Sequence, residues 1–351
     1  MFFSACRGLS TDGGKVARFI PTVQFAPRPD PWPVRFPMPG IAAQTLHASG
    51  LLRQRAESAR QRLECCTLCP RRCRVNRLAG ETGRCSTGAH ARIASYGPHF
   101  GEEQPLVGTN GSGTIFLAGC NLCCCFCQNY EISQGNEPAQ EVDAHGFAAI
   151  MLELQAMGCH NINLVTPSHV VPQLLAALVP AIEGGLDIPI VFNCSGYESV
   201  ATLDLLAGAI DIYMPDVKFW YPRSAARYAQ APDYPERVRA ALVRMHRQVG
   251  DLVIGPDGIA RSGLLIRHLL MPGLLAETEA ILRFIATALS PATYVNIMAQ
   301  YHPCGRADQF EELRRTISGD EYRQALEIAA TLGLTRIDRP DLSRLLQRLG
   351  M

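Results

Sequence analysis

The sequence lacks any marked excess of charge and any long uncharged apolar run. Its 351 residues carry 33 Lys and Arg against 32 Asp and Glu, a formal net charge of +1. So balanced a chain gives no electrostatic reason to bind nucleic acid or a membrane surface. Without an apolar run of about 18 residues, a membrane-spanning helix is not expected. A secretory signal is also lacking, so we do not expect export.

Cysteine, by contrast, is abundant. The chain has 14 cysteines. In a chain without a secretory signal, clustered cysteines hold metal more often than they form disulfides, because the compartment is reducing. We therefore expect a soluble, cytoplasmic protein that contacts no membrane.

The stretch from Thr114 to Gln134 has the densest cysteine group. An apolar run from Thr114 to Ala118 predicts a short buried strand, and five cysteines follow within eight residues. Cys120, Cys124 and Cys127 have the spacing C-x3-C-x2-C. The spacing alone also allows C-x2-C-x3-C, with Cys123 as the middle ligand. Adjacent cysteines rarely satisfy disulfide geometry, so a metal site is favoured.

Three thiolates are one fewer than the four that usually hold an iron-sulfur cluster. One iron is then left without a protein ligand. Such an iron can chelate the amino and carboxylate groups of S-adenosylmethionine and pass it one electron, which gives a 5′-deoxyadenosyl radical.

This stretch resembles the radical SAM superfamily, including Phe126 before the last cysteine, and in that register Cys124 is the middle ligand. Within the superfamily the chain is most similar to the pyruvate formate-lyase activating-enzyme-like group. The likeness runs, with gaps, from about Leu63 to His302. The segments that carry it are GSGTIFLAGCNLCCCFCQNYEISQ, NLVTPSH, FNCSGYE, MPDVKFW and MPGLL. It implies a 4Fe-4S cluster, S-adenosylmethionine as cofactor and a one-electron reductant such as flavodoxin or ferredoxin.

A second cysteine group precedes the first. Its glycines supply turns that let the last cysteine fold back on the others. Four thiolates so spaced suit zinc or a second iron-sulfur cluster, and reduced structural cysteines are the alternative. Arginines make the region basic, but no aromatics are interleaved with them, so a solvated face is favoured over an RNA-binding one. The cysteines are Cys66, Cys69, Cys73 and Cys85, and the arginines are Arg71, Arg72, Arg74 and Arg77.

Short β-rich runs alternate with helical ones from Gly113 onward. Such units imply parallel strands with right-handed crossovers. Because a complete barrel takes eight units, six predict an α/β fold with a partial (βα)6 barrel, open on one side, beside a small Cys-rich N-terminal module. The resemblance implies the same fold. The expected strands are Thr114–Ala118, Asn161–Val165, Pro189–Asn193, Ile210–Met214, Gly263–Leu270 and Thr293–Met298.

Composition and the likeness together divide the chain into four parts. Residues 26–39 are so rich in proline that neither a helix nor a central strand can persist there. The expected parts are 1–62, an N-terminal lead-in with this proline-rich segment and a helix; 63–112, the Cys-rich module; 113–335, the radical SAM core; and 336–351, a C-terminal helix.

Chemistry in such barrels lies at the C-terminal ends of the strands. Asp216 and Lys218 match the D-x-K pair of the family, which implies that Lys218 neutralises the carboxylate of S-adenosylmethionine. Asp216 would bind its ammonium or a ribose hydroxyl. The family has a Gly-Gly-Glu-Pro type turn after the second strand; this chain has Val165-Thr166-Pro167-Ser168-His169, so Thr166 is expected to serve there. The remaining candidates are Asn193 and Ser195 for the ribose and His268 for the wall near adenine or substrate.

The resemblance favours an activating enzyme that abstracts hydrogen from a glycine of a partner glycyl-radical protein. A radical SAM enzyme acting on a small molecule or RNA is the alternative within the class. Outside it stand a non-catalytic iron-sulfur electron carrier and a zinc-stabilised binding module. Polar residues at the six strand ends, Asp216 and Lys218 among them, argue against the electron carrier, because core packing does not explain them. The zinc-stabilised module predicts a colourless protein.

Overall fold

The computed structural model describes residues 41–135 and 137–338, which lie in one compact unit. The predicted proline-rich segment and residues 339–351 of the predicted C-terminal helix fall outside these residues. The described start of that predicted helix, residues 336–338, is extended and bridges to the last strand, Ile337 pairing with Val295.

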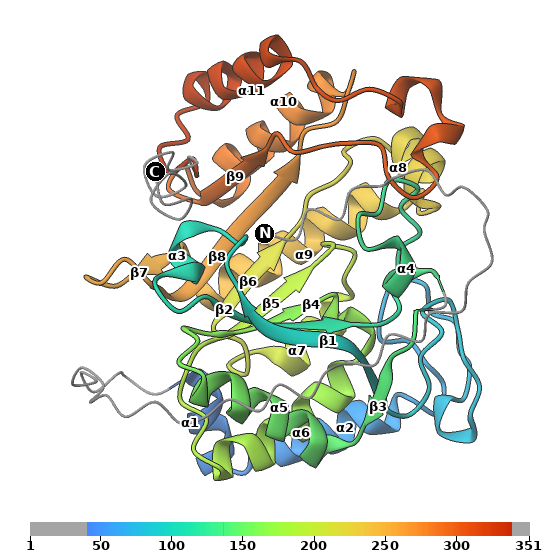
Figure 1. Cartoon of the computed structure of the whole chain (residues 1–351), viewed down its shortest axis with the longest axis vertical. Helices are drawn as coiled ribbons and strands as arrows, with labels where there is room; N and C mark the ends of the chain where they lie inside the picture. Colours follow the sequence, from blue (N-terminus) through green and yellow to red (C-terminus); the bar gives the residue numbers. More distant parts are fainter. Residues whose placement is uncertain (1–40, 136, 339–351) are drawn as a thin grey trace, which may run out of the picture. The chain divides into compact units, whose positions relative to one another are not determined.

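Six parallel strands form the centre of the fold (Figure 1). Each coincides with a strand expected from the sequence, with ends shifted by three residues or fewer, and their spatial order follows the chain. Apolar β-branched and aromatic residues dominate them, as expected for strands covered on both faces. The strands are β2 (Ser112–Leu117), β4 (Ile162–Val165), β5 (Ile190–Cys194), β6 (Ile212–Pro215), β8 (Ala260–Leu269) and β9 (Tyr294–Met298).

Three further strands extend the sheet at its edges. β1 (Ala91–His99) pairs antiparallel with β2, and β3 (Gln140–Val142) pairs antiparallel with β1. β7 (Val253–Ile254) forms a short hairpin with β8. The sequence reading missed all three. Because β1 belongs to the segment predicted as a separate Cys-rich module, the sheet crosses the predicted boundary at residue 113.

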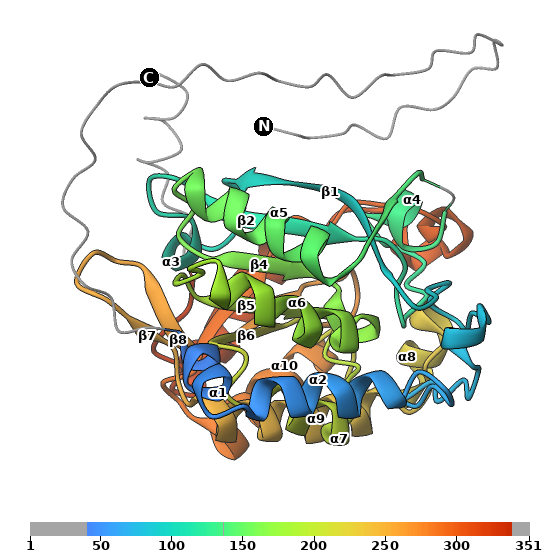
Figure 2. The ribbon, with the colours of Figure 1, turned by 90° about the horizontal axis from the view of Figure 1, so that it is seen from below.

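Helices cover the outer face of the sheet, and α2 runs beside α6 as an additional outer element (Figure 2). The one helix expected within residues 1–62 is two helices in the described part of that segment, because Gly50 adopts a left-handed conformation with φ 76°. The helices are α1 (Ala42–Ala48), α2 (Leu51–Gln61), α4 (Tyr130–Ser133), α5 (Ala144–Ala156), α6 (Val171–Glu183), α7 (Val200–Leu206), α8 (Pro222–Ala229), α9 (Tyr234–Val249), α10 (Leu275–Phe284) and α11 (Gly319–Thr331).

One short helix, α3 (Gln104–Val107), lies against the inner face of the sheet instead. Leu106 is fully buried in an apolar cluster with Val191, Ile212 and Leu265, which belong to β5, β6 and β8. The carbonyl of Leu106 accepts a hydrogen bond of 2.8 Å from Asn161 Nδ2. The N-terminal part of the sheet interior is thus packed, and the polar residues lie towards the C-terminal ends of the strands.

Candidate active site

The loop after β2 carries the predicted cluster cysteines. Cys124 is buried, while Cys120 and Cys127 are half-buried. Burial raises the pKa of the Cys120 thiol to about 12 and that of Cys124 well above its ordinary value, although the charge of Lys218 acts in the opposite direction on both. The N–H of Leu122 also donates to Cys120 Sγ at 3.4 Å. These thiols therefore need a cationic partner to become thiolates, as metal binding provides.

The structure groups Cys124 with the other two predicted ligands. Cys124 lies close enough to Cys120 and Cys127 for their charges to raise its pKa. Cys125 lies in a different environment, near the charges of Arg306 and Glu312. The charge of Cys123, the alternative middle ligand, also raises the pKa of Cys120. The charges of both partner cysteines and of Lys218 act on Cys124, which favours the C-x3-C-x2-C assignment.

The donor set fits a polynuclear cluster better than a single ion. In the part of the chain that the structure describes, no three His, Cys, Asp or Glu side chains converge as ligands of one metal ion would. An iron-sulfur cluster requires a different ligand geometry, since each of its irons binds a separate thiolate and the thiolates need not meet at one point. Three neighbouring thiols on one loop, with a lysine beside them, meet that demand and leave one iron without a protein ligand.

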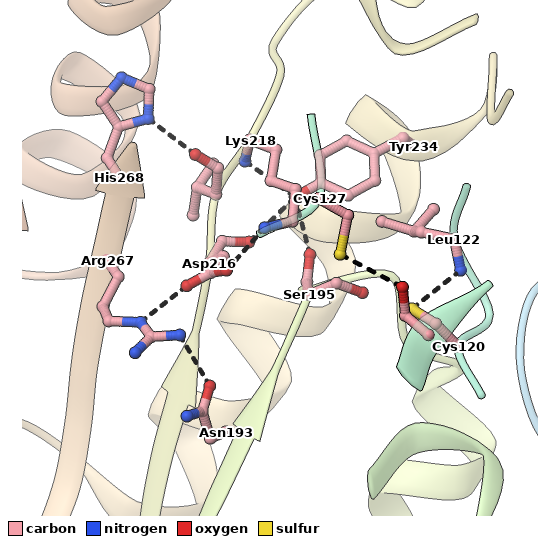
Figure 3. A network of polar contacts seen from close by, with 12 residues as sticks. Cys120, Leu122, Cys127, Asn193, Ser195, Asp216, Lys218, Tyr234, Arg267 and His268 are labelled. Carbon is pink, nitrogen blue, oxygen red and sulfur yellow. Dashed lines mark hydrogen bonds and ion pairs between the residues drawn. The ribbon is translucent and has the colours of Figure 1, made fainter. Parts of the chain in front are cut away.

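A row of charged side chains extends from this loop across the strand ends (Figure 3). Lys218 Nζ lies 2.6 Å from Asp216 Oδ2, and Arg267 Nε donates to Asp216 Oδ1 at 2.7 Å. Arg267 Nη2 also donates to Asn193 Oδ1 at 2.8 Å. Burial alone would raise the pKa of Asp216, but the charges of Arg267 and Lys218 outweigh it and hold this pKa at about 2. One network of hydrogen bonds and ion pairs therefore connects three of the predicted residues, Asp216, Lys218 and Asn193, through Arg267.

Thr166 and Ser195 lie at the ends of β4 and β5. Thr166 has φ 62° and ψ 51°, a left-handed conformation that is costly for a β-branched residue. Its N–H donates to the carbonyl of Asn193 at 2.8 Å, which fixes this conformation beside the strand end. Ser195 Oγ donates to Asn121 Oδ1, at 3.4 Å, in the cysteine loop. Both predicted residues thus lie at the C-terminal edge of the sheet.

Tyr234, at the start of α9, ties two strand ends together. Its buried hydroxyl lies 2.8 Å from the carbonyl of Ser195 and 2.9 Å from that of Asp216, and it accepts from the N–H of Lys218 at 2.9 Å. The chain around Asp216 and Lys218 is therefore rigidly placed. Sequence reasoning did not single out Tyr234, because its role is to bind backbone atoms far away in sequence.

The structure does not bring His268 to the site. Its ring lies on the opposite face of β8 from Arg267, between Val217 O, at 2.7 Å from Nδ1, and Thr278 Oγ1, at 2.9 Å from Nε2. Burial lowers the pKa of His268 to about 4. His268 is thus a neutral residue that joins β8 to α10, and Arg267 occupies the inner face in its place.

Two acidic residues between β1 and α3 were also missed. Glu102 Oε2 lies 3.3 Å from Arg267 Nη1, and Glu103 Oε1 accepts from Asn296 Nδ2, in β9, at 2.8 Å. Burial raises the pKa of Glu103 to about 7, and its Oε2 has no hydrogen-bond partner. The segment before α3 therefore connects to β8 and β9, the strands at the other side of the barrel opening.

The second cysteine group surrounds a cavity of its own. The residues that line it include Cys66, Cys69, Cys73 and Cys85. The expectation of a solvated basic face holds for Arg72 and Arg74, which are exposed, and fails for the other two arginines. Arg77 is 1% exposed and donates to the carbonyls of Gly88 and His169, and Arg71 donates to the carbonyl of Asn121.

No helix in the described ranges combines the length and the apolar character that a bilayer span requires. No disulfide links the cysteines of these ranges.

Two solved structures of HydG show a partial likeness to this chain. One is a crystal structure of HydG, a maturase of the FeFe-hydrogenase, with 13% identity over 64% of this chain and 50% of that chain, at a TM-score of 0.43. The other, from Carboxydothermus hydrogenoformans, has 16% identity over 68% of this chain and 55% of that chain, at a TM-score of 0.46. The chain thus spans about half the length of these structures.

The sequence comparisons identify a relative that matches most of the chain. No family model matches the chain. An uncharacterized protein of Methanocaldococcus jannaschii, MJ0674, is 32% identical over 294 residues, which are 82% of this chain and 80% of that protein. The chain therefore belongs to the same family as MJ0674.

Proposed function

We propose that the chain is a radical SAM enzyme. The observation that carries this proposal is the grouping of Cys120, Cys124 and Cys127 on one loop beside Lys218, at the C-terminal edge of a six-stranded partial barrel. A 4Fe-4S cluster bound there would supply the electron that cleaves S-adenosylmethionine and yields the 5′-deoxyadenosyl radical for hydrogen abstraction.

The charged row at the strand ends supplies complementary partners for S-adenosylmethionine. Lys218 offers a cation for the carboxylate, and Asp216 stays ionised at neutral pH, so it can accept from the ammonium. The carbonyl of Thr166, in its constrained turn, is a second acceptor for the ammonium. Asn193 and Ser195 have groups suited to the ribose hydroxyls. Tyr234 holds the backbone of this region in place.

The substrate in this proposal is a glycine of a partner glycyl-radical protein, as in the activating enzymes that the chain resembles. Flavodoxin or ferredoxin is the proposed reductant, and the cytoplasm the proposed compartment. The sheet is open between its edge strands, which favours access of a peptide loop to the strand ends.

A small-molecule substrate is the second candidate, and one contact favours it. Glu102 and Glu103 connect the β1–α3 segment to Arg267 and Asn296, on the far strands β8 and β9. This bridge narrows the lateral opening that a peptide loop would use. A compact substrate needs less room.

Anaerobic reconstitution followed by measurement of 5′-deoxyadenosine and methionine tests the reaction. The reduced wild type should form both products and bind about four irons at this loop. Cys124→Ala should lose iron and product formation, while the neighbouring Cys125→Ala, whose thiol faces Arg306 and Glu312, should keep both. Absence of product from a fully loaded wild type would refute the enzyme class.

The substrate class is tested with a host-cell extract separated by dialysis. If the partner is a protein, the protein fraction should raise 5′-deoxyadenosine formation and develop a glycyl-radical signal in electron paramagnetic resonance. If the small-molecule filtrate alone raises product formation, the partner-protein proposal is rejected and the second candidate stands.

A further inference from the structure

The four cysteines around the second cavity come from three separate turns. Cys66 and Cys69 lie in the turn after α2, Cys73 follows in the next turn, and Cys85 comes from the turn before β1. Cys69, Cys66 and Cys85 are near enough for their charges to act on one another. Four thiols from separate turns around one cavity are the donor set of structural zinc sites and of iron-sulfur clusters.

The backbone beside these cysteines has left-handed conformations, and one amide donates to a sulfur. Arg72 and Arg74, on both sides of Cys73, have positive φ angles of 45° and 58°, and Ser86, next to Cys85, has φ 53°. Left-handed conformations of residues other than glycine cost free energy and persist only where other contacts impose them. The N–H of Arg84 donates to Cys73 Sγ at 3.5 Å. The turns thus present amides to sulfur, which favours sulfur as a negatively charged ligand.

The Cys-rich turns also hold the loop of the candidate active site. Arg71 donates to the carbonyl of Asn121 at 2.8 Å and to that of Gln230 at 2.6 Å. A Cβ on Gly119, directly before Cys120, would lie 2.2 Å from the carbonyl oxygen of Cys85. Gly119 has φ +88°, so only glycine meets both requirements. Asn121 itself lines the cysteine cavity.

A second path connects the two sites through a buried arginine. Arg77 Nη1 donates to the carbonyl of His169 at 2.8 Å, and His169 Nε2 lies 2.9 Å from the carbonyl of Ala118. Because a carbonyl only accepts, His169 must carry its proton on Nε2. Arg77 Nη1 also lies 4.0 Å from Cys66 Sγ. The same arginine therefore contacts a cavity thiol and supports the start of the cysteine loop.

We propose that Cys66, Cys69, Cys73 and Cys85 bind an iron-sulfur cluster rather than zinc, because no three side chains in the described ranges converge as ligands of one ion would, and that this cluster fixes the loop of Cys120, Cys124 and Cys127. The cluster would hold three turns in fixed positions. The contacts of Arg71, Arg77 and Gly119 with these turns would then also fix the position of the loop that carries Cys120. Binding of metal to the four thiols is independent of the proposed function. Only the effect on the loop rests on it.

Metal analysis of the full chain with Cys120, Cys124 and Cys127 all changed to alanine tests the first part. The proposal expects one cluster per chain to remain: about four irons with a sulfide-dependent visible absorption. Adding Cys69→Ala should remove it. Adding Cys65→Ala instead should not, because Cys65 is exposed and outside the cavity. A folded triple variant that takes up no iron after reconstitution with iron and sulfide would overturn the proposal.

Iron release to a chelator tests the second part without measuring catalysis. Arg71→Met should leave the metal at the four thiols in place and speed iron loss from the Cys120 loop by about tenfold, since charge-assisted hydrogen bonds to that loop are lost. Arg60→Met, at an exposed arginine of α2 outside the cavity, is the matched control and should release iron at the wild-type rate. Equal rates for both variants would refute the coupling while leaving the metal site and the enzyme class untouched.

Discussion

Lys218 lies between the cysteine loop and Asp216, so its charge serves both. Replacing it with alanine removes the cation that we assign to the carboxylate of S-adenosylmethionine. We expect Lys218→Ala to bind S-adenosylmethionine about ten- to a hundredfold more weakly, the loss of a charge-assisted hydrogen bond of roughly 1.5 to 3 kcal/mol. Calorimetry on anaerobically reconstituted protein measures the affinity, with iron content as control. Unchanged affinity at equal iron content would assign Lys218 to a purely structural ion pair.

Asp216 should make stability depend on pH in the acid range. Its pKa is lowered to about 2 in the folded chain from an ordinary 3.8, so its ionised form is favoured by folding. The stabilisation, about 2 kcal/mol, is complete above roughly pH 4 and is lost as the pH falls through about 2. Urea unfolding of wild type and Asp216→Asn should therefore differ most near pH 6, and the difference should shrink as the pH falls below about 4 and nearly vanish by about pH 2. A difference that grows on acidification would contradict this sign.

For single residues, the sequence identified those that come directly after a recognisable strand. Asp216 and Lys218 were found because they come directly after a recognisable strand within a known pattern. His268 was chosen over Arg267 because the face of β8 that lines the site was not identified from the sequence. Side chains alternate along a strand, so Arg267 and His268 must lie on opposite faces. In the structure Arg267 is the one that lies beside Asp216. Glu102 could not be found, because its contact with Arg267 depends on the path of a loop.

Among the elements, α3 has the most unusual position, since it fills the interior of the sheet. Leu106→Ala should leave a cavity there and lower the free energy of unfolding by about 2 to 5 kcal/mol. Leu51→Ala, on the outside of α2, is the control, because Leu51 is 42% exposed and its truncation should cost less than about 0.5 kcal/mol. Chemical denaturation measures both. A cost for Leu106→Ala as small as that of the control would mean that α3 is not a packed element.

The six parallel strands were predictable because each is a short apolar run with its own local signal. β1 was not, since Gly97 and Pro98 interrupt its pattern. α8 was missed because its eight residues make only about two helical turns, and it begins with Pro222. Elements that are short or interrupted carry less information in their own residues.

On the scale of the whole molecule, metal loading should raise stability. Ligands that bind the folded chain more tightly than the unfolded chain shift the unfolding equilibrium by mass action. We expect the reconstituted wild type to unfold at a temperature several degrees above the metal-free protein, as about 2 kcal/mol or more would produce. Anaerobic thermal unfolding measures this. The variant with alanine at Cys120, Cys124 and Cys127 should keep only the part of the shift that comes from the four-cysteine cavity. Identical midpoints with and without metal would contradict both metal assignments.

The charges at the strand ends alternate in sign from Lys218 to Asp216, Arg267 and Glu102. The electrostatic potential of such a row nearly cancels at long range. At close range the row presents positive and negative charges a few ångströms apart. A zwitterion can satisfy both signs at once, whereas a neutral nucleoside satisfies neither. S-adenosylhomocysteine, which keeps the amino-acid headgroup, should therefore compete with S-adenosylmethionine at least about tenfold better than methylthioadenosine, which lacks it; equal inhibition would show that adenine contacts alone decide binding. The same selectivity would retain the intact cofactor and release the nucleoside product.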